Sequence, residues 1–444
     1  MSEKKRKVVD HDLRQFIKKL GYVAGGSALL STMPWLKSCT PEMATAIGQE
    51  RKTRVGLIGT GSRGKFLIHA LLDMPNAEIV ALCDNFAPNL QEALDLAPWA
   101  RTYTDYRALL DANDIDGVII ATPLYQHPQQ TLDALEAGKH VFCEKAMGNT
   151  MEECKKVYDA YQKTDKVLYY CLQRMYDEKY IKGMGLIHSG TIGEVVGSRC
   201  HWFRNHDWRR PIPSPEWERH INWRLYWDYS GGLITELGSH QIEVSNWAMQ
   251  RTASTVCGMG DIVFWKDGRE VYDSISLVYG YEDGRKLTYE SLISNRFNGM
   301  EDQILGNKGT MHLASGVYYY EDVNRNQSGI EQLLGQIGDR VFQAIPAAGA
   351  TWRPETRDTF RPHFILGHGN FNVGEGLVMV GAQGDGTEEV LASFLQACVT
   401  GEKAEHLVEE CYIATVLCLL GNEAIKKQTT LTIPEEYKIA HMKF

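Results

Sequence analysis

The stretch from Arg54 to Asp84 limits what this chain can fold into more than any other part of it. Its order is a short apolar run, the turn Gly59-Thr60-Gly61-Ser62-Arg63-Gly64, a helical apolar pattern, and a second apolar run that ends in the acid. A dinucleotide-binding unit requires this order of strand, glycine turn, helix, strand and acid. The alternative interpretation is an ordinary glycine-rich turn between a strand and a helix.

The glycine turn predicts where a dinucleotide would lie. Gly59 allows a tight turn, Gly61 lets the backbone approach a pyrophosphate, and Gly64 lets the helix pack closely on the strand. The helix begins at Ser62 and Arg63, and the free N–H groups at its start would meet the phosphates.

Asp84 indicates which dinucleotide is bound. Its carboxylate would accept hydrogen bonds from an adenosine ribose. The same negative charge disfavours a 2′-phosphate, so the sequence predicts NAD rather than NADP as the cofactor.

Size and charge narrow the class of protein. A chain of 444 residues, 43% of them hydrophobic, has room for two domains with substantial cores. The net charge is −9, and because the first 38 residues are basic, the chain from Cys39 onward carries −14. That acidity argues against nucleic acid as a partner. No apolar run in the sequence reaches the roughly 20 residues that a membrane span needs.

The first 50 residues resemble a targeting segment and linker rather than part of the fold. A basic region precedes a weakly apolar stretch at 20–33, and Leu36-Lys37-Ser38-Cys39 resembles a lipoprotein box. Residues 13–19 resemble the twin-arginine export motif, with Leu13 in place of the first arginine. We expect a periplasmic protein or a lipoprotein anchored to the membrane at Cys39. A disordered basic tail on a cytoplasmic enzyme is the alternative.

The ten cysteines form no C-x-x-C pair, and most of them lie in apolar strand or helix patterns. This distribution is typical of small buried hydrophobic residues. We expect neither a metal site nor a disulfide framework.

Residues 51–173 continue the alternation of strands and helices. Helices are predicted at 129–137 and at 150–163, the second capped by Asn149 or Thr150. Apolar strands are predicted at 116–122, 140–143 and 167–172. Repeated βα units with continuous apolar strands predict an α/β domain, a doubly wound parallel sheet of Rossmann type.

Residues 174–444 have an α+β pattern. The predicted helices are 178–188, 237–249, 387–399 and 407–426. The predicted strands are 195–203, 274–281, 286–293 and 310–320, with hairpin turns at Asp283-Gly284 and Lys308-Gly309. We expect a mainly antiparallel sheet with one face against the first domain, and a long loop insertion at 324–386.

Four parts of the sequence together resemble a known family. They are the glycine turn, Thr122-Pro123 followed by His127, and two further segments. The first segment, Gly138-Lys139-His140-Val141-Phe142-Cys143-Glu144-Lys145, ends a strand, and the second, Glu236-Leu237-Gly238-Ser239-His240, opens a helix. They resemble the Gfo/Idh/MocA oxidoreductases, which are NAD(P)-dependent enzymes acting on sugars, inositols and their derivatives. The resemblance covers residues 54–320 well and the closing helices more loosely.

The resemblance implies which groups react. Lys145, at the carboxyl end of a buried strand, would polarise a hydroxyl or hold the nicotinamide ribose. His240 would accept the hydroxyl proton, a role suited to an unperturbed pKa near 6.5. Glu236 would orient His240 or touch the substrate, since the i, i+4 spacing puts both on one helix face. The alternatives are a surface lysine, a helix-capping histidine and an ordinary first-turn acid.

The chain departs from the family pattern at two places. The usual Glu-Lys-Pro is Glu144-Lys145-Ala146, which retains the lysine. The usual Asp-x-x-x-His has become Glu236-x-x-x-His240, and the glutamate reaches one methylene further than an aspartate.

The remaining expected contacts lie on both sides of a cleft. Five of the ten tryptophans fall between Trp202 and Trp227, where flat rings would stack on sugars or else pack in a core or interface. For His127 a helix-capping role is the alternative to a cofactor contact. The expected cofactor contacts are Thr122, Pro123, His127, Glu144, Lys145 and Gln173, and the expected substrate contacts are Arg174, Trp223 and Arg224.

The resemblance implies an NAD-dependent oxidoreductase that acts on a sugar or glycoside hydroxyl, and our first hypothesis is oxidation at C3 to a 3-keto sugar. No soluble NAD pool exists outside the cytoplasm, so an exported enzyme should hold NAD tightly and recycle it internally. The small-molecule substrate would be a carbohydrate, and we expect a homo-oligomer, a dimer or a tetramer.

Two other functions stay open. One is an NAD-dependent glycosidase that oxidises C3, eliminates the C1 substituent, adds water and reduces the ketone. It resembles the α-N-acetylgalactosaminidases of the family, whose histidine- and tyrosine-rich loop this chain lacks. The other is a non-catalytic sugar or dinucleotide sensor, a class that tends to lose the lysine or the histidine retained here as Lys145 and His240.

Overall fold

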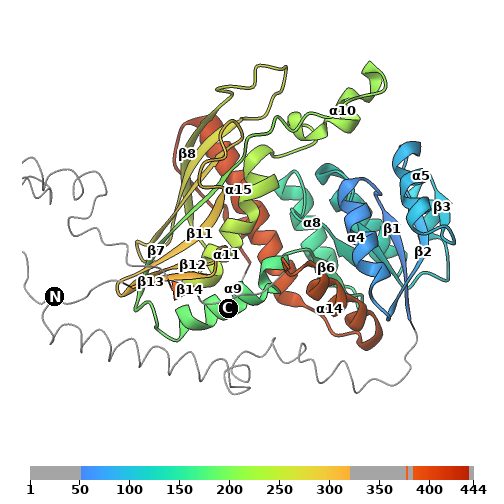
Figure 1. The fold of residues 1–444 in the computed structure, drawn as a ribbon, viewed down its shortest axis with the longest axis horizontal. Coiled ribbons are helices and arrows are strands. Elements are labelled where there is room, and N and C mark those ends of the chain that lie inside the picture. The colour runs from blue at the N-terminus through green and yellow to red at the C-terminus, as the bar shows by residue number, and fades with distance from the viewer. Residues whose placement is uncertain (1–51, 321–376, 379–383, 440–444) are drawn as a thin grey trace, which may run out of the picture.

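The computed structural model describes residues 52–320, 377–378 and 384–439 and shows two units that lie side by side (Figure 1). The expected targeting segment at 1–50, with Cys39, lies outside the described residues. So does most of the expected insertion at 324–386.

The first unit is a six-stranded parallel sheet with strand order β3-β2-β1-β4-β5-β6. This order is that of a doubly wound dinucleotide-binding sheet, so the predicted fold of this domain is confirmed. Its strands are β1 Thr53–Ile58, β2 Ala77–Cys83, β3 Arg101–Tyr103, β4 Gly117–Ile120, β5 His140–Cys143 and β6 Leu168–Tyr170. Its helices are α4 Ser62–Leu72, α5 Ala87–Leu96, α6 Tyr106–Leu110, α7 His127–Glu136 and α8 Met151–Tyr161.

Local sequence explains the bounds of these elements. β4 and most of β5 are buried on both faces, which is why they read as unbroken apolar runs. Helix α8 begins after Thr150, whose side chain accepts a hydrogen bond from the backbone N–H of Glu153. Of the two predicted caps, Thr150 is therefore the one that the structure uses.

The second unit is a nine-stranded sheet with strand order β14-β13-β12-β11-β7-β10-β9-β8-β15. Within the described strands of this second sheet only β7 and β10 pair in parallel, so the prediction of a mainly antiparallel sheet is confirmed. The long strands are β7 Val195–Phe203, β8 Thr255–Asp261, β9 Ser274–Gly280, β10 Lys286–Leu292 and β11 Met300–Gly306. The short strands are β12 Gly309–His312, β13 Val317–Tyr320, β14 Leu377–Val378 and β15 Leu431–Thr432.

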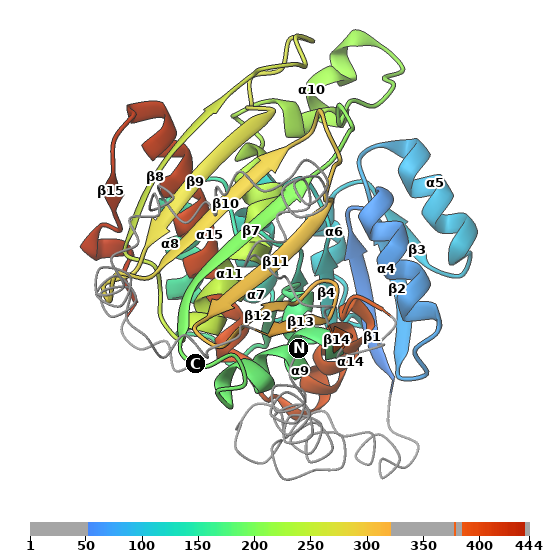
Figure 2. The ribbon, with the colours of Figure 1, turned by 60° about the vertical axis from the view of Figure 1, so that its left-hand side comes forward.

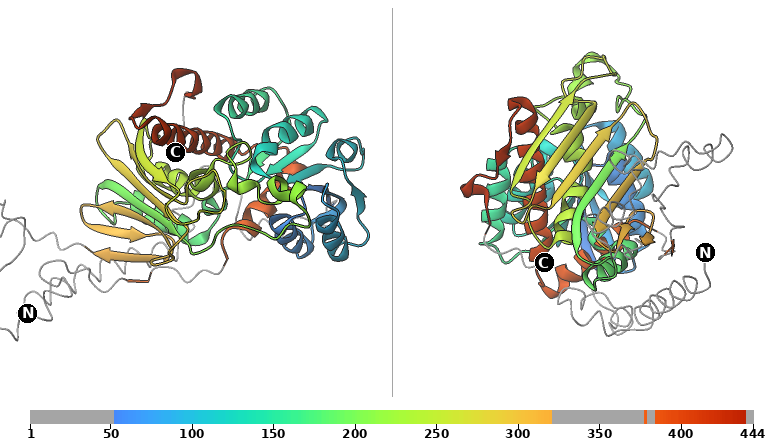
Figure 3. Two further views of the ribbon diagram at one scale, coloured as in Figure 1. Left: turned by 90° about the horizontal axis from the view of Figure 1, so that it is seen from above. Right: turned by 90° about the vertical axis from the view of Figure 1, so that its left-hand side faces the viewer.

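A helical layer lies between the second sheet and the first domain. Helix α11, Ser239–Met249, packs on β7 and β11, and helix α15, Glu405–Lys427, packs on β8 and also on α8 and β6 (Figures 1 and 3). The expectation that the sheet itself faces the first domain is therefore wrong. The physical reason is that α15 is buried nearly all round, so it has apolar surface for both domains. The right-hand view of Figure 3 shows the opposite face of the sheet, which no described helix covers.

Helix α14, Thr387–Thr400, belongs spatially to the first domain although it follows the second in sequence. It packs on β1, β5 and α4. Thr53 donates from its hydroxyl to the carbonyl oxygen of Leu395 at 3.2 Å, and the rings of Phe142 and Phe394 lie 5.6 Å apart. The last part of the chain thus completes the first core.

Two predicted elements differ from the structure in detail. The predicted strand 310–320 is a hairpin of β12 and β13, because Gly316 adopts a left-handed φ of 67° and lets the chain reverse. The predicted helix 237–249 begins earlier, with a π-helical turn at Ile234–Gly238 that leads into α11. The strands β8 and β11 were not predicted.

A short helical segment of the second domain contacts the first domain. Helix α10, Glu218–Ile221, projects from the second domain on the side where α5 lies (Figures 1 and 2). The ring of Trp217, just before α10, meets that of Phe86 edge-on at 4.8 Å between centroids. Helix α9, Glu178–His188, spans the residues predicted for it.

Candidate active site

A cleft of about 1270 Å³ opens between the two domains. The first domain contributes the carboxyl ends of β1, β2, β4 and β5, where open α/β sheets bind their ligands. The second domain contributes the end of β7, the loop that follows it, and the turn before α11. The predicted site residues that line this cleft are Gly59, Gly61, Ser62, Arg63, Asp84, Thr122, Pro123, His127, Glu144, Lys145, Gln173, Trp223, Arg224, Glu236 and His240.

The glycine turn has the geometry of a phosphate cradle. Gly59 adopts a φ of 89°, and a Cβ atom at Gly64 would lie 2.1 Å from the carbonyl oxygen of Gly59, so both positions require glycine for the turn itself. At Gly61 the nearest atom to an added Cβ is Asn89 Nδ2, at 3.7 Å. The space above Gly61 is therefore open, and no side chain caps the start of α4. These features fit a pyrophosphate that takes the free N–H groups.

Gly64 has a packing role rather than a place in the cleft wall. It was predicted among the cofactor-binding residues, and it does not line the cleft. Its contact with Gly59 fixes how closely α4 approaches β1. Gly64 therefore determines the shape of the glycine turn without contacting the cofactor space.

Asp84 anchors the glycine turn from the end of β2. Its Oδ2 accepts from the backbone N–H and the hydroxyl of Thr60, at 2.9 and 3.2 Å, and its Oδ1 accepts from the N–H of Phe86 at 2.8 Å. Oδ1 has one such bond, so a lone pair is left for a ribose hydroxyl.

Other predicted cofactor contacts are held by neighbours at the sheet edge. Arg63 donates to Glu144 Oε1 at 2.6 Å, and the Thr122 hydroxyl donates to Gln130 Oε1 at 2.6 Å. Both ring nitrogens of His127 lie 2.9 Å from backbone carbonyl oxygens, those of Thr122 and Ala146. Through these two hydrogen bonds the His127 ring connects the end of β4 to the segment after β5.

Lys145 reaches across the cleft to the second domain. Its Nζ donates a hydrogen bond to the backbone carbonyl oxygen of Glu236, in the π-helical turn before α11. Burial lowers the pKa of the Lys145 ammonium, although the negative charges of Glu236 and Glu144 oppose the shift. A lysine with a lowered pKa gives up and takes back a proton closer to neutral pH.

His240 faces the same space from the first turn of α11. Burial, and next the positive charge of Lys145, hold the pKa of His240 well below its usual range. The general-base role expected for His240 therefore has to work with a pKa below the unperturbed value near 6.5. Its Nδ1 is buried without a hydrogen-bond partner in the described part of the chain.

Glu236 serves Arg224 rather than His240. Its Oε2 accepts from Arg224 Nε at 2.8 Å, and no hydrogen bond to His240 is found among the described residues. The guanidinium of Arg224 also lies over the Trp223 ring, 4.2 Å from its centroid. Glu236, Arg224 and Trp223 thus form one connected wall of the cleft.

Arg174 is not part of the cleft wall. It is buried, its Nη1 donates to Asp302 Oδ2 at 2.8 Å, and its guanidinium lies over the rings of Tyr180 and Trp202. The predicted direct contact between Arg174 and a substrate is not supported by this position.

Some tryptophans of the tryptophan-rich stretch line the cleft, and others pack against neighbouring side chains. Trp202, Trp208 and Trp223 line the cleft, as do Arg204 and Arg210. Trp217 instead meets Phe86 and His220, and Trp227 lies under the ammonium of Lys426.

Sequence reasoning missed a number of cleft residues, three of which are aromatic or histidine side chains. Phe86, His206 and His220 line the cleft, although no motif marks them. The available signal was position: Phe86 follows Asp84 by two residues, and both histidines flank the tryptophans.

The described residues include neither a candidate metal site nor a candidate membrane-spanning helix. They contain no group of three or more His, Cys, Asp or Glu side chains arranged to hold a metal ion. No helix within the described ranges combines the length and apolarity needed to cross a membrane.

Known proteins match this chain in both domains. A model described as the oxidoreductase family with an NAD-binding Rossmann fold matches residues 53–171. A model of the GFO/IDH/MocA C-terminal domain matches residues 182–312.

Curated relatives match over shorter stretches. A glycosyl hydrolase family 109 protein of Shewanella baltica is 30% identical over 183 residues, 39% of this chain and 39% of the relative. An inositol 2-dehydrogenase of Salmonella paratyphi B is 31% identical over 207 residues, 46% of this chain and 56% of the relative. The chain spans about half the length of the curated relatives that it matches, or less.

The fold is shared with solved structures. Levoglucosan dehydrogenase in complex with NADH and L-sorbose superimposes with a TM-score of 0.65 at 20% identity, covering 87% of this chain and 100% of that chain. The two family models together span more than half of the sequence. The chain therefore belongs to the Gfo/Idh/MocA family of oxidoreductases, with an NAD-binding Rossmann domain at residues 53–171.

Proposed function

We propose that this protein oxidises a hydroxyl of a sugar or glycoside, at C3, to give a 3-keto sugar. The observation that carries the proposal is the position of Lys145, which ends β5 in the NAD-binding domain and is held by the carbonyl of Glu236 in the second domain. Sugar-stacking rings, Trp202 and Trp223, line the same cleft.

The chain supplies binding and proton transfer, while bound NAD would supply the hydride acceptor. Lys145 accepts the proton of the hydroxyl, because its lowered pKa makes the neutral amine accessible. His240 is neutral near pH 7, and its Nδ1 has no hydrogen-bond partner among the described residues, so it is better suited to bind the reacting hydroxyl than to be its sole base.

Relatives favour a polyhydroxylated substrate. The match named inositol 2-dehydrogenase and the solved levoglucosan dehydrogenase bear names of enzymes that act on such compounds.

We further propose that NAD is held tightly and recycled within the site. The contact between Trp217 and Phe86 supports this, because it bridges the domains beside Asp84, at the adenosine end of the cleft. A cofactor under such a bridge would leave slowly, which suits a protein that oxidises one compound and reduces another.

Net glycoside hydrolysis is the second candidate. The relatives named glycosyl hydrolase family 109 protein and, in Shewanella oneidensis, α-N-acetylgalactosaminidase favour it. Oxidation at C3 would acidify C2–H, the C1 substituent would be eliminated, water would add, and the ketone would be reduced. Release of 4-nitrophenol from 4-nitrophenyl glycosides without added NAD distinguishes this route from simple oxidation.

Location and assembly remain proposals drawn from the sequence. We propose export and lipid attachment at Cys39, and a homo-oligomer whose interface uses the sheet face left uncovered by helices. Membrane fractionation of wild type and Cys39→Ala tests the first, and light scattering tests the second.

The proposed activity is tested by absorbance at 340 nm. The full chain, loaded with NAD, is mixed with a panel of free sugars, inositols and methyl glycosides. A band at 340 nm and a 3-keto product support the proposal. A sugar that binds without reducing NAD would indicate a non-catalytic sensor instead.

A further inference from the structure

Two arginines on the second-domain wall of the cleft have guanidinium groups that no carboxylate neutralises within the described residues. Arg204 follows β7, and its guanidinium lies over the Trp202 ring, 4.8 Å from the centroid. Arg210 lines the cleft six residues later. Their neighbour Arg209 is different, because it forms ion pairs with Glu218 and Asp267.

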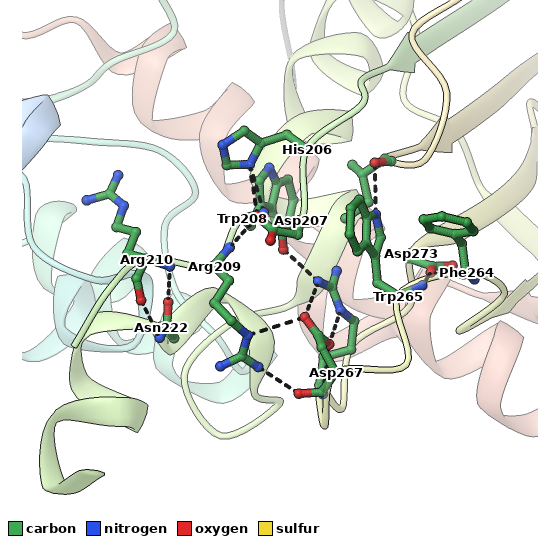
Figure 4. Close-up of polar contacts among 12 residues, drawn as sticks. His206, Asp207, Trp208, Arg209, Arg210, Asn222, Phe264, Trp265, Asp267 and Asp273 are labelled. Atoms are coloured by element: carbon green, nitrogen blue, oxygen red, sulfur yellow. Dashed lines mark hydrogen bonds and ion pairs between the residues drawn. The ribbon is translucent and has the colours of Figure 1, made fainter. Parts of the chain in front are cut away.

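The backbone that carries Arg210 is fixed in place. The N–H of Arg210 donates to Asn222 Oδ1 at 2.7 Å, and Asn222 Nδ2 donates back to the Arg210 carbonyl at 3.1 Å. Figure 4 shows this pair of bonds, with the Arg210 guanidinium extending away from the hydrogen-bonded loop.

The preceding residues are held as firmly. Trp208 has a left-handed φ of 63°, and its N–H donates to His206 Nδ1 at 2.8 Å. Arg269 donates to the carbonyl oxygen of Asp207 at 2.6 Å and is itself paired with Asp267. The loop is thus ordered by its own contacts, which leaves Arg210 free for a ligand.

Positive charge exceeds negative charge on this wall. Arg204, Arg210 and Arg224 contribute three charges, and Glu236, already bonded to Arg224, is the one carboxylate among the second-domain residues that line the cleft. Partial burial, and next the charge of Arg224, lower the pKa of both Arg204 and Arg210. The excess is local, because the whole chain carries −9.

We infer that the substrate carries an anionic group, a carboxylate or a sulfate or phosphate ester, which Arg204 and Arg210 bind. Guanidinium forks match the oxygens of such groups and bind them through charge-assisted hydrogen bonds. The inference rests on the proposed function, since it names the substrate class of the same cleft: an acidic sugar or glycoside rather than a neutral one.

The competing explanation is that these arginines bind the pyrophosphate of NAD. The glycine turn and the open start of α4 already provide for that group on the opposite wall. The two explanations differ in which ligand a substitution weakens, so the affinity for NAD has to be measured alongside the affinity for sugars.

Calorimetry on the full chain loaded with NAD tests the inference. The probes are matched pairs that differ in one group: glucose and glucuronate, galactose and galacturonate, and galactose and its 6-sulfate. The variants are Arg204→Gln, Arg210→Gln and Arg210→Lys, with Arg199→Gln as control. Arg199 is exposed on β7 and does not line the cleft, so its replacement removes the same charge elsewhere.

The inference predicts that the anionic member of at least one pair binds about tenfold or more tightly than its neutral partner. Each Gln variant should weaken that ligand by about tenfold and leave NAD and the neutral partner unchanged. Arg210→Lys should retain part of the affinity, and Arg199→Gln all of it. A preference for the anionic member of a uronate pair would identify a carboxylate as the bound group, and a preference within the sulfate pair would identify a sulfate ester.

Two outcomes would overturn the inference: no pair prefers its anionic member, or the Gln variants weaken NAD and not the acid. Absorbance at 340 nm separates this failure from that of the proposed function. Neutral sugars that reduce NAD while acids do not bind would leave the oxidation intact and remove the anion site. Acidic sugars that bind through the arginines without reducing NAD would support the anion site and contradict the proposed oxidation.

Discussion

Nζ of Lys145 donates a hydrogen bond to the backbone carbonyl oxygen of Glu236, and this contact joins the end of β5 to the turn that opens α11. The acceptor is a carbonyl rather than a carboxylate, so this hydrogen bond positions Lys145 without forming an ion pair. Burial lowers its pKa in that setting.

The pH dependence of the hydride step should reveal which group is the base. A base acts when unprotonated, so a lowered lysine pKa predicts a rate that rises with pH through an inflection below the lysine reference of about 10.4. The depressed pKa of His240 predicts no inflection at 6.5. Stopped-flow reduction of bound NAD from pH 5 to 10 measures this. An inflection near 6.5 that disappears in His240→Ala would assign the base to His240.

The glycine turn should separate cofactor binding from folding. Gly61→Val adds a side chain in open space, so the variant should fold with the melting temperature of NAD-free wild type and fail to bind NAD. Gly64→Ala should lower the melting temperature, because its Cβ would lie 2.1 Å from the Gly59 carbonyl oxygen. The clash should outweigh the gain of roughly 1 kcal/mol that alanine brings to a helix. Retention of NAD by Gly61→Val would mean that the pyrophosphate lies elsewhere.

These glycines show what a local pattern can predict. The strand His140–Cys143 and the turn at Gly59 were predicted because a buried parallel strand is an unbroken apolar run and a phosphate turn needs glycine at fixed offsets. The site residues near that turn and at Lys145 follow from the same local signals.

Other features depend on partners that are distant in sequence. Arg174 was predicted to bind substrate, but its partner Asp302 is 128 residues away, and no local pattern reveals that pair. The strand β11 was missed for the related reason that Glu301, Asp302 and Gln303 make it polar. The strand β8 was missed because Gly258 and Gly260 weaken its pattern.

Asp84 should set the preference for NAD over NADP. Its carboxylate would repel a 2′-phosphate, so the dissociation constant for NADP should exceed that for NAD by about tenfold or more. Asp84→Asn removes the charge but keeps an oxygen that can accept from the Thr60 N–H. It should therefore lower the ratio of the NADP to the NAD dissociation constant and leave the glycine turn in place. Calorimetry with both dinucleotides measures the ratio. Equal or tighter binding of NADP by wild type would contradict the assignment.

A buried carboxyl should make stability fall with pH. Both carboxyl oxygens of Glu243 in α11 are buried without a hydrogen-bond partner in the described structure, and burial raises its pKa to about 8. A raised acid pKa stabilises the fold at low pH, and that stability is lost as pH rises from about 4.5 to 8. Glu243→Gln should therefore raise the melting temperature more at pH 8 than at pH 5. Exposed Glu290→Gln is the control, and an equal effect at both pH values would show that Glu243 is ionised in the fold.

The central claim is that Lys145 takes a proton from a sugar hydroxyl while hydride passes to NAD in this cleft. Single-turnover reduction of bound NAD, followed at 340 nm after mixing with a substrate sugar, tests it directly. Lys145→Ala and His240→Ala should each slow the band by about 10²–10⁴-fold while NAD stays bound. A Lys145→Ala protein that reduces its NAD at the wild-type rate would contradict the account.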